Sequence, residues 1–170
     1  MTTTDYQAAV LEHKDRVYSY ARYLLRHSED AQDVAQECLL RLWHHREHVE
    51  SGAACRNWLL RSAHNLCIDT IRRRQSRPEV ARDENAPDPA DVRPDAFRIA
   101  SASQASGVLE QALLELSERD RAIVLLREVE GMPYDEIAAL LDLNLGTLKA
   151  TLHRVREKLR AALTRAEVTP

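Results

Sequence analysis

A proline-rich acidic segment divides the chain into two halves of different character. The segment "RPEVARDENAPDPADVRPD" (77–95) contains four prolines and no aromatic residue. Proline cannot donate a backbone hydrogen bond, and a segment with so few large apolar residues cannot bury enough surface to fold. Its acidic charge and its prolines keep it extended. The sequence therefore predicts two folded units joined by a flexible acidic linker.

Apolar residues recur every three or four positions in both halves, which is the period of an α-helix. The chain has only four glycines among 170 residues and no stretch in which apolar and polar residues alternate as in a strand. The fold class is therefore expected to be all-α. The positions that mark three helices in the first half are Val10, Val17, Ala21 and Leu24; Ala31, Val34, Ala35, Cys38, Leu42 and Trp43; and Leu59, Ala63, Leu66, Thr70 and Ile71.

Several residues with known end preferences predict where the helices begin and end. Ser28 is placed to cap the second helix, and Ser117 to cap another, with Asp120 three residues on as a short-armed capping box. Gly131 predicts a helix end, and Pro133 predicts the start of a short helix over residues 134–141.

Cysteine usage and hydropathy indicate a cytoplasmic protein. Cys38, Cys55 and Cys67 are odd in number and far apart, with no C-x-x-C pair, so neither a disulfide framework nor a zinc ribbon is indicated. No apolar run approaches the roughly 20 residues that a membrane span needs. We expect reduced thiols, no bound metal, no cofactor and no membrane insertion.

The helix predicted over residues 144–160, "NLGTLKATLHRVREKLR", is amphipathic and basic. Leu148, Leu152, Val155 and Leu159 recur at spacings of four, three and four and line one face. A short helix, a turn of about four residues and a longer basic helix form a helix-turn-helix pattern, in which the second helix enters the major groove of DNA. A purely structural helical hairpin is the alternative. A membrane-surface helix is disfavoured because the apolar face lacks Trp and Phe.

Two polar faces in the first half are candidate binding surfaces. The second helix has Asp30, Asp33, Glu37 and Arg41 at spacings of three, four and four, opposite its apolar stripe. Such a face is ordinarily just solvated.

The third helix also places polar residues on one side. They are Trp58, Arg61, Asn65, Asp69 and Arg72, and the helix ends in the run Arg72–Arg74. An amide among an aromatic ring and several arginines suits stacking on unpaired bases and recognition of their edges.

Four motifs in this order resemble a known family. They are "HSEDAQDVAQECLLRLW" (27–43), "NWLLRSAHNLCIDTIRRR" (57–74), "LSERDRAIVLLREVEGMPYDEIAALL" (116–141) and "LGTLKATLHRVREKL" (145–159). The chain is similar to the extracytoplasmic function (ECF, group IV) sigma factors of bacterial RNA polymerase. The resemblance implies a sigma region 2 helical bundle over residues 1–77, a flexible linker over 78–105 and a sigma region 4 helix-turn-helix domain over 106–170.

The resemblance also implies a role for each of three groups of residues. The residues expected to contact core polymerase are Asp30, Asp33, Gln36 and Glu37. Those expected to contact the −10 element are Trp58, Arg61, Asn65, Arg72 and Arg73, with Asn65 reading a flipped base beside the loop 50–56. Those expected to contact the −35 element are Thr147, Lys149, Ala150, His153 and Arg154, although family members often have a hydroxyl residue where Ala150 stands.

The implied partners are core RNA polymerase, promoter DNA and an anti-sigma factor. Core polymerase would be bound through the coiled coil of its largest subunit and, by the second domain, through its flap. We expect no catalytic residues and no enzymatic activity. Another possibility is a stand-alone helix-turn-helix repressor that binds duplex DNA, but it would need neither the acidic face nor the acidic linker. A hydrolase site or a metal pair at His44 and His48 is the least favoured possibility, since no third ligand is evident.

Overall fold

A computed structural model describes residues 1–76 and 104–168, and every regular element within these ranges is a helix. The prediction of an all-α protein is therefore confirmed. The chain divides into two compact units, Met1–Pro94 and Asp95–Pro170. Most of the expected linker lies outside the described residues, and helix α5 begins at Gln104, inside its expected range.

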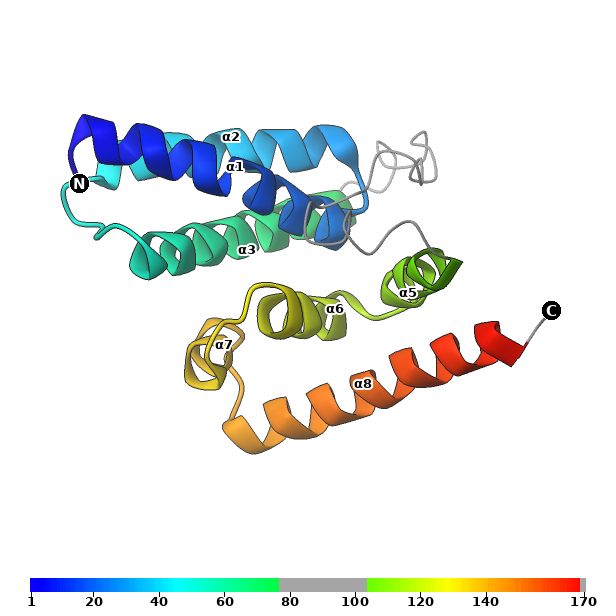
Figure 1. Ribbon diagram of the computed structural model, residues 1–170. Helices are drawn as coiled ribbons and strands as arrows, with labels where there is room; N and C mark the ends of the chain where they lie inside the picture. Colours follow the sequence, from blue (N-terminus) through cyan, green and yellow to red (C-terminus); the bar gives the residue numbers. More distant parts are fainter. Residues whose placement is uncertain (77–103, 169–170) are drawn as a thin grey trace. The chain divides into compact units, whose positions relative to one another are not determined.

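Three long helices form the first unit. They are α1 (Thr3–Leu25), α2 (Ser28–His45) and α3 (Ala53–Ser76), and each packs against the other two (Figure 1). Each helix turns its apolar stripe inward, as the helical period of the sequence predicts. The side chains that fill this core include Val17, Leu24, Leu42, Leu59, Leu60 and Ala63.

The turn between α1 and α2 is tight and differs from the sequence prediction in one residue. Arg26 follows α1 in the left-handed conformation, with φ 58°. His27 is the N-cap of α2, because its backbone is extended and its ring Nδ1 accepts a hydrogen bond from the backbone N–H of Asp30 at 3.3 Å. The expectation that Ser28 caps this helix was wrong, since Ser28 is already its first helical residue.

The second unit is built around one long helix, α8, which packs against α5, α6 and α7. The short helix α7 and the long helix α8 are joined by a turn at residues 141–144, the helix-turn-helix arrangement that the sequence predicts (Figure 1). Among the described helices of both units, none is long and apolar enough to span a membrane. The elements of this unit are α5 (Gln104–Leu114), α6 (Glu118–Val124), the π-helical turn η3 (Leu125–Val129), α7 (Tyr134–Leu140) and α8 (Leu145–Val168).

The predicted helix ends of this unit are confirmed at Ser117, Gly131 and Pro133, but the expected capping box is not formed, because the Asp120 carboxylate contacts Arg154 and not the backbone N–H of Ser117. The Ser117 hydroxyl accepts from the backbone N–H of Asp120 at 3.1 Å and caps α6. Gly131 has φ 67°, a left-handed conformation that costs a glycine little, and Pro133 is the N-cap of α7.

Helix α6 continues directly into a wide turn that the sequence did not predict. Over η3 the hydrogen bonds span five residues, and the backbone N–H of Glu130 donates to the carbonyl of Leu125 at 3.0 Å. Single turns of this kind are rare and often lie beside functional sites. At this turn Arg127 stacks over the ring of Tyr134, the first residue of α7, at 4.4 Å from its centroid.

Candidate nucleic-acid interface

The outward side of α2 forms an acidic face, defined here as Asp33, Gln36 and Glu37. Asp33 and Gln36 are exposed, and half-exposed Glu37 accepts from Arg41 Nε at 2.7 Å one turn later. Leu40 continues this face and is 55% exposed, which is unusual for a leucine of this helix. The sequence analysis did not single out Leu40, although its spacing of four from Gln36 places it on the same side. The acidic face therefore combines negative charge with one accessible apolar side chain.

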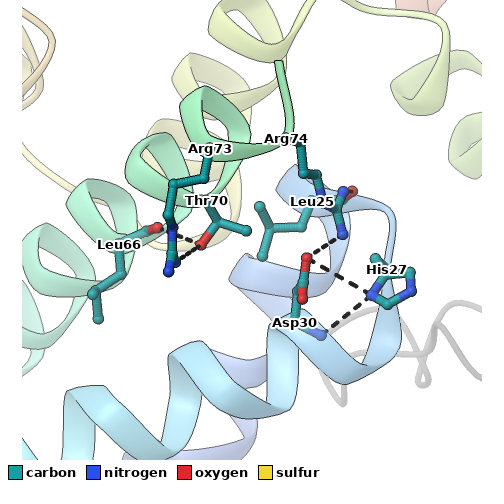
Figure 2. A network of polar contacts seen from close by, with 7 residues as sticks. All are labelled: Leu25, His27, Asp30, Leu66, Thr70, Arg73 and Arg74. Carbon is teal, nitrogen blue, oxygen red and sulfur yellow. Dashed lines mark hydrogen bonds and ion pairs between the residues drawn. The ribbon is translucent and has the colours of Figure 1, made fainter. Parts of the chain in front are cut away.

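Asp30 stands apart from the acidic face because it is used inside the bundle. Its carboxylate forms an ion pair with Arg74 near the end of α3 and lies 3.8 Å from His27 Nδ1 (Figure 2). Arg74 also donates to the carbonyl of Leu25 at 3.2 Å. Asp30 and Arg74 thus join the ends of all three helices.

The outward side of α3 presents the predicted polar residues together. Asn65 is exposed, and its side chain has no hydrogen-bond partner in the described part of the chain. Trp58 is half-buried against His45, with 5.9 Å between the ring centroids, and Arg61 is half-buried one turn further along. Asp69 is exposed on the same side. The exposure of these side chains therefore increases along the helix, from the partly buried ring of Trp58 to the exposed amide of Asn65.

The arginine run at the end of α3 separates into inward and outward members. Arg74 points into the bundle, whereas Arg72 and Arg73 are exposed. Arg73 donates to the Thr70 hydroxyl at 3.1 Å, and that hydroxyl donates to the Leu66 carbonyl at 2.9 Å (Figure 2). Two exposed arginines, Arg72 and Arg73, therefore place positive charge at this end of the helix.

The loop that precedes α3 is shorter than the sequence analysis expected. The expected loop 50–56 ends at Gly52, which has φ 73°, and α3 begins at Ala53. Cys55 is fully buried, and burial raises the pKa of its thiol. Burial of Cys55 together with Leu59, one turn later, draws this segment into the helix. Only residues 50–52 of the expected loop remain outside the helix.

A buried hydrogen bond supports the α3 face from beneath. The Tyr20 hydroxyl lies 2.9 Å from His64 Nδ1, and both side chains are buried. Burial lowers the pKa of His64 to about 4, so the ring is neutral at pH 7. His64 precedes Asn65 directly, so this bond between α1 and α3 fixes the backbone from which Asn65 projects.

The first turns of α8 project the residues predicted to contact DNA. Their backbone is capped by the Asn144 side chain, which accepts from the N–H of Thr147 at 2.7 Å. Leu148, Leu152 and Val155 are fully buried and fix the rotation of the helix. The residues left exposed by this rotation are Thr147, Lys149, Ala150, His153 and Arg154.

Two arginines of α8 form ion pairs with carboxylates of α6 and η3. Arg154 Nη2 lies 3.1 Å from both carboxylate oxygens of Asp120, at the start of α6. Arg156 bonds Glu128 of η3 through Nε at 3.1 Å and Nη2 at 2.6 Å. These partners lie 34 and 28 residues away in the chain. The sequence analysis missed both pairs because no local pattern connects residues so far apart.

Comparison with family models gives two matches that together cover most of the chain. Residues 9–77 match Sigma-70 region 2, and residues 106–159 match Sigma-70 region 4. The first match covers most of α1 and all of α2 and α3, and the second runs from α5 through α7 to residue 159 within α8.

Curated relatives resemble the chain over nearly its whole length. ECF RNA polymerase sigma factor SigE of Mycolicibacterium smegmatis is 35% identical over 92% of this chain, which spans 60% of the length of that relative. SigL of Mycobacterium tuberculosis is 31% identical over 93% of this chain and 88% of its own length. SigW of Bacillus subtilis is 28% identical over 89% of this chain and 84% of its own length.

Two solved structures have a similar fold. The sigma factor RpoE in complex with the anti-sigma factor NepR from Bartonella quintana matches 99% of this chain and 100% of its own, with a TM-score of 0.74 and 23% identity. CnrH in complex with the cytosolic domain of CnrY matches 94% of this chain and 88% of its own, with a TM-score of 0.58 and 25% identity.

Proposed function

The chain belongs to the ECF RNA polymerase sigma factors, which direct promoter-specific transcription, and from this premise we propose how its exposed faces divide that task. The acidic face of α2 docks on core polymerase, the polar face of α3 reads the −10 element, and the first turns of α8 read the −35 element. The chain acts as a group IV member of the family, a regulatory subunit without catalysis of its own. Its domains are residues 1–77 and 106–170, joined by the linker 78–105.

Docking on core polymerase is assigned to the acidic face because of its charge and accessibility. Asp33 and Gln36 project from α2, and Leu40 adds an apolar contact beside them. The expected partner, the coiled coil of the largest polymerase subunit, would supply complementary positive charge, which favours a correct encounter. Asp30 contributes indirectly, because its ion pair with Arg74 fixes the start of α2.

The α3 face suits a single strand with one base turned out of the stack. Asn65 offers both donors and an acceptor to a base edge, and it stands exposed beside half-buried Arg61. Half-buried Trp58 can extend the apolar surface beneath a stacked base. Arg72 and Arg73 at the far end of α3 would then contact the phosphate backbone.

The α8 surface suits the major groove of duplex DNA. Lys149 and His153 are exposed on the first turns of the helix, and the buried leucine stripe holds them outward. Thr147 and Ala150 complete the surface at the N-terminal end, where backbone N–H groups are available to phosphates. Arg154 lies at its edge, paired with Asp120.

The best supporting observation is that α2, α3 and α8 each present polar side chains on a face that does not pack against its own unit. A stand-alone repressor would use the α8 surface alone and has no use for the faces of α2 and α3. Control by a cognate anti-sigma factor is part of the proposal, since one solved structure of similar fold is a complex of the sigma factor RpoE with the anti-sigma factor NepR.

Capture of core polymerase by the full chain tests the proposal. Asp33→Arg with Glu37→Arg should weaken holoenzyme assembly by about 2 kcal/mol or more, because it places positive charge against the expected positive partner. Asp15→Arg with Glu47→Arg is the matched control, since both residues are exposed and the change of net charge is the same. Loss of assembly in the control as well, or normal assembly by the first variant, would overturn the assignment of the acidic face.

A further inference from the structure

The carboxylate of Asp120 contacts Arg154 through one guanidinium nitrogen, Nη2. Nη2 of Arg154 lies 3.1 Å from Oδ1 and 3.1 Å from Oδ2, so a single nitrogen faces both oxygens. A guanidinium presents five N–H donors in a rigid planar fork. Two-donor contacts use either Nε with Nη2 or Nη1 with Nη2, so Nη2 belongs to both pairs. Nη2 carries two N–H groups, so any partner that takes two donors from Arg154 must share this nitrogen with Asp120, whose negative charge repels a second acceptor there.

Asp120 is fixed and Arg154 is accessible. The Asp120 side chain is 12% exposed and the Arg154 side chain 54%. Asp120 lies in the first turn of α6, where its backbone N–H donates to Ser117 and the helix end favours negative charge. The carboxylate is thus part of the folded scaffold, and the guanidinium is the part that a partner can reach.

This geometry limits what Arg154 can read. Recognition of guanine by arginine in the major groove uses two donors at once, to O6 and N7. A phosphate oxygen can be contacted by one donor. The pairing also reduces the net charge near this side chain, and net positive charge attracts phosphates of any sequence.

Other charges on α8 are arranged differently. Lys149 lies 6.0 Å from the centroid of the Tyr134 ring, and His153 is exposed, and neither has a carboxylate partner among the described residues. Arg156 is held by Glu128, a pair in which both side chains are more than 40% exposed. Arg154 combines an exposed guanidinium with a nearly buried carboxylate, unlike the pair of Arg156 with Glu128.

We propose that Asp120 is a specificity-determining residue for −35 recognition: it restricts Arg154 to a single-donor contact with a phosphate and reduces sequence-independent attraction. Sequence reading by α8 then rests on Lys149 and His153. The inference rests on the proposed function, because it requires that α8 bind the upstream promoter element.

The test uses holoenzyme reconstituted from the full chain and core polymerase. The probes are a promoter duplex that the wild-type holoenzyme selects from a randomised pool and the same duplex with its upstream element scrambled. Affinity for both is measured over a range of salt concentrations. If the wild type selects no upstream element, the proposed function fails; the outcomes below concern Asp120 alone.

Asp120→Asn keeps the size of the side chain and removes its charge. It should bind the scrambled duplex more tightly, with a salt slope steeper by about one, and should lower the ratio of selected to scrambled affinity by roughly tenfold. Arg154→Lys should keep that ratio within about twofold, since a lysine can replace a single-donor contact but not a two-donor one. Asp120→Asn should leave the ratio of selected to scrambled affinity unchanged when Arg154 is alanine.

A matched control is Glu128→Gln, which removes the pair between Arg156 of α8 and η3 and should leave the ratio unchanged. Asp120→Ser checks that the result does not depend on the asparagine side chain, and circular dichroism checks that each variant is folded. The proposal is overturned if Asp120→Asn leaves both the ratio and the salt slope at wild-type values. It is equally overturned if Arg154→Lys abolishes discrimination at one guanine of the selected element.

Discussion

The two units hold their recognition helices in place by different kinds of polar contact. In the first unit the contacts between helices are buried or partly buried, as in the Tyr20–His64 bond and the Asp30–Arg74 ion pair, and they involve side chains other than those of the acidic face and Asn65. In the second unit the basic helix is held by Arg154 and by its neighbour Arg156, which belong to the charged surface itself.

This difference predicts which conditions each unit responds to. Buried histidines make the first unit sensitive to acid. Burial lowers the pKa of the ring in the folded state, so acid protonates the histidine in the unfolded chain first, and the free energy of unfolding falls. The exposed pair of Arg156 with Glu128, together with the exposed guanidinium of Arg154, makes the second unit sensitive to salt, because solvent-exposed charges are screened. Stability and recognition are therefore separable in the first unit and linked in the second.

The largest expected effect is the acid sensitivity of the first unit. The pKa of His64 is about 4 in the folded protein against an ordinary value of 6.5, so the unfolded chain takes up a proton before the folded one does. The stabilisation is fully present above pH 6.5 and is lost as pH falls toward 4, by up to about 3 kcal/mol. Burial lowers the pKa of His13 as well, which acts in the same direction.

Both tryptophans of the chain, Trp43 and Trp58, lie in the first unit, so their fluorescence reports its unfolding by denaturant at each pH. His64→Gln keeps a hydrogen-bonding group opposite Tyr20 and removes the titration, so its stability should depend less on pH. An equal pH dependence in this variant would show that His64 is not the cause.

Asn65→Ala should separate binding from stability. Its side chain is exposed and has no partner among the described residues, so the free energy of unfolding should change by less than about 0.5 kcal/mol. Binding of the holoenzyme to a matched −10 strand should lose about 1–3 kcal/mol. The loss should vanish when the one base that Asn65 reads is changed. Additive effects of residue and base, without coupling, would mean that Asn65 does not read that base.

Asp30→Asn should act in the opposite way to Asn65→Ala, because it should lower the free energy of unfolding. The ion pair with Arg74 joins α2 to α3, with the two side chains 29% and 33% exposed, so we expect a loss of about 1 kcal/mol. Asp33→Asn is the matched control three residues away, on the exposed face, and should leave stability unchanged. Denaturant unfolding of both variants by tryptophan fluorescence is the measurement. A larger stability loss in Asp33→Asn would invalidate the distinction drawn between these two carboxylates.

The smallest effect is expected at the ion pair between Glu128 of η3 and Arg156 of α8. Glu128 and Arg156 are 43% and 44% exposed, so Glu128→Gln should cost less than about 0.5 kcal/mol at low salt and nothing measurable at high salt. Thermal unfolding followed by circular dichroism at two salt concentrations is the measurement. A cost above about 1 kcal/mol that persists at high salt would show that this pair is more than a surface contact.

Local patterns predicted most of the fold. Apolar spacing predicted the helices, and Ser117, Gly131 and Pro133 marked their ends, because each acts on backbone groups within a few residues. The cap at His27 was missed because a ring nitrogen is an unusual acceptor at that position.

The sequence predicted which residues share each candidate face, but not which residues of other helices they contact. Spacing alone placed Asn65 with Arg61 and Lys149 near His153. It could not show that Asp30 meets Arg74, 44 residues away, or that Asp120 meets Arg154, since these contacts depend on how helices pack. The roles of these faces in binding polymerase and promoter remain predictions for the experiments above.

The wide turn η3 has a consequence for the helical phase of the second unit. A π-helical turn holds one more residue than an α-helical turn, and an extra residue in an uninterrupted α-helix would rotate everything beyond it by about 100°. The turn at Leu125–Val129 absorbs that rotation, so the backbone that follows keeps the direction that an α-helix one residue shorter would give it. The extra residue instead widens the turn from which Glu128 reaches Arg156 and Arg127 reaches the ring of Tyr134. The chain thus accommodates one additional residue at this turn without changing the direction of the helical axis on either side.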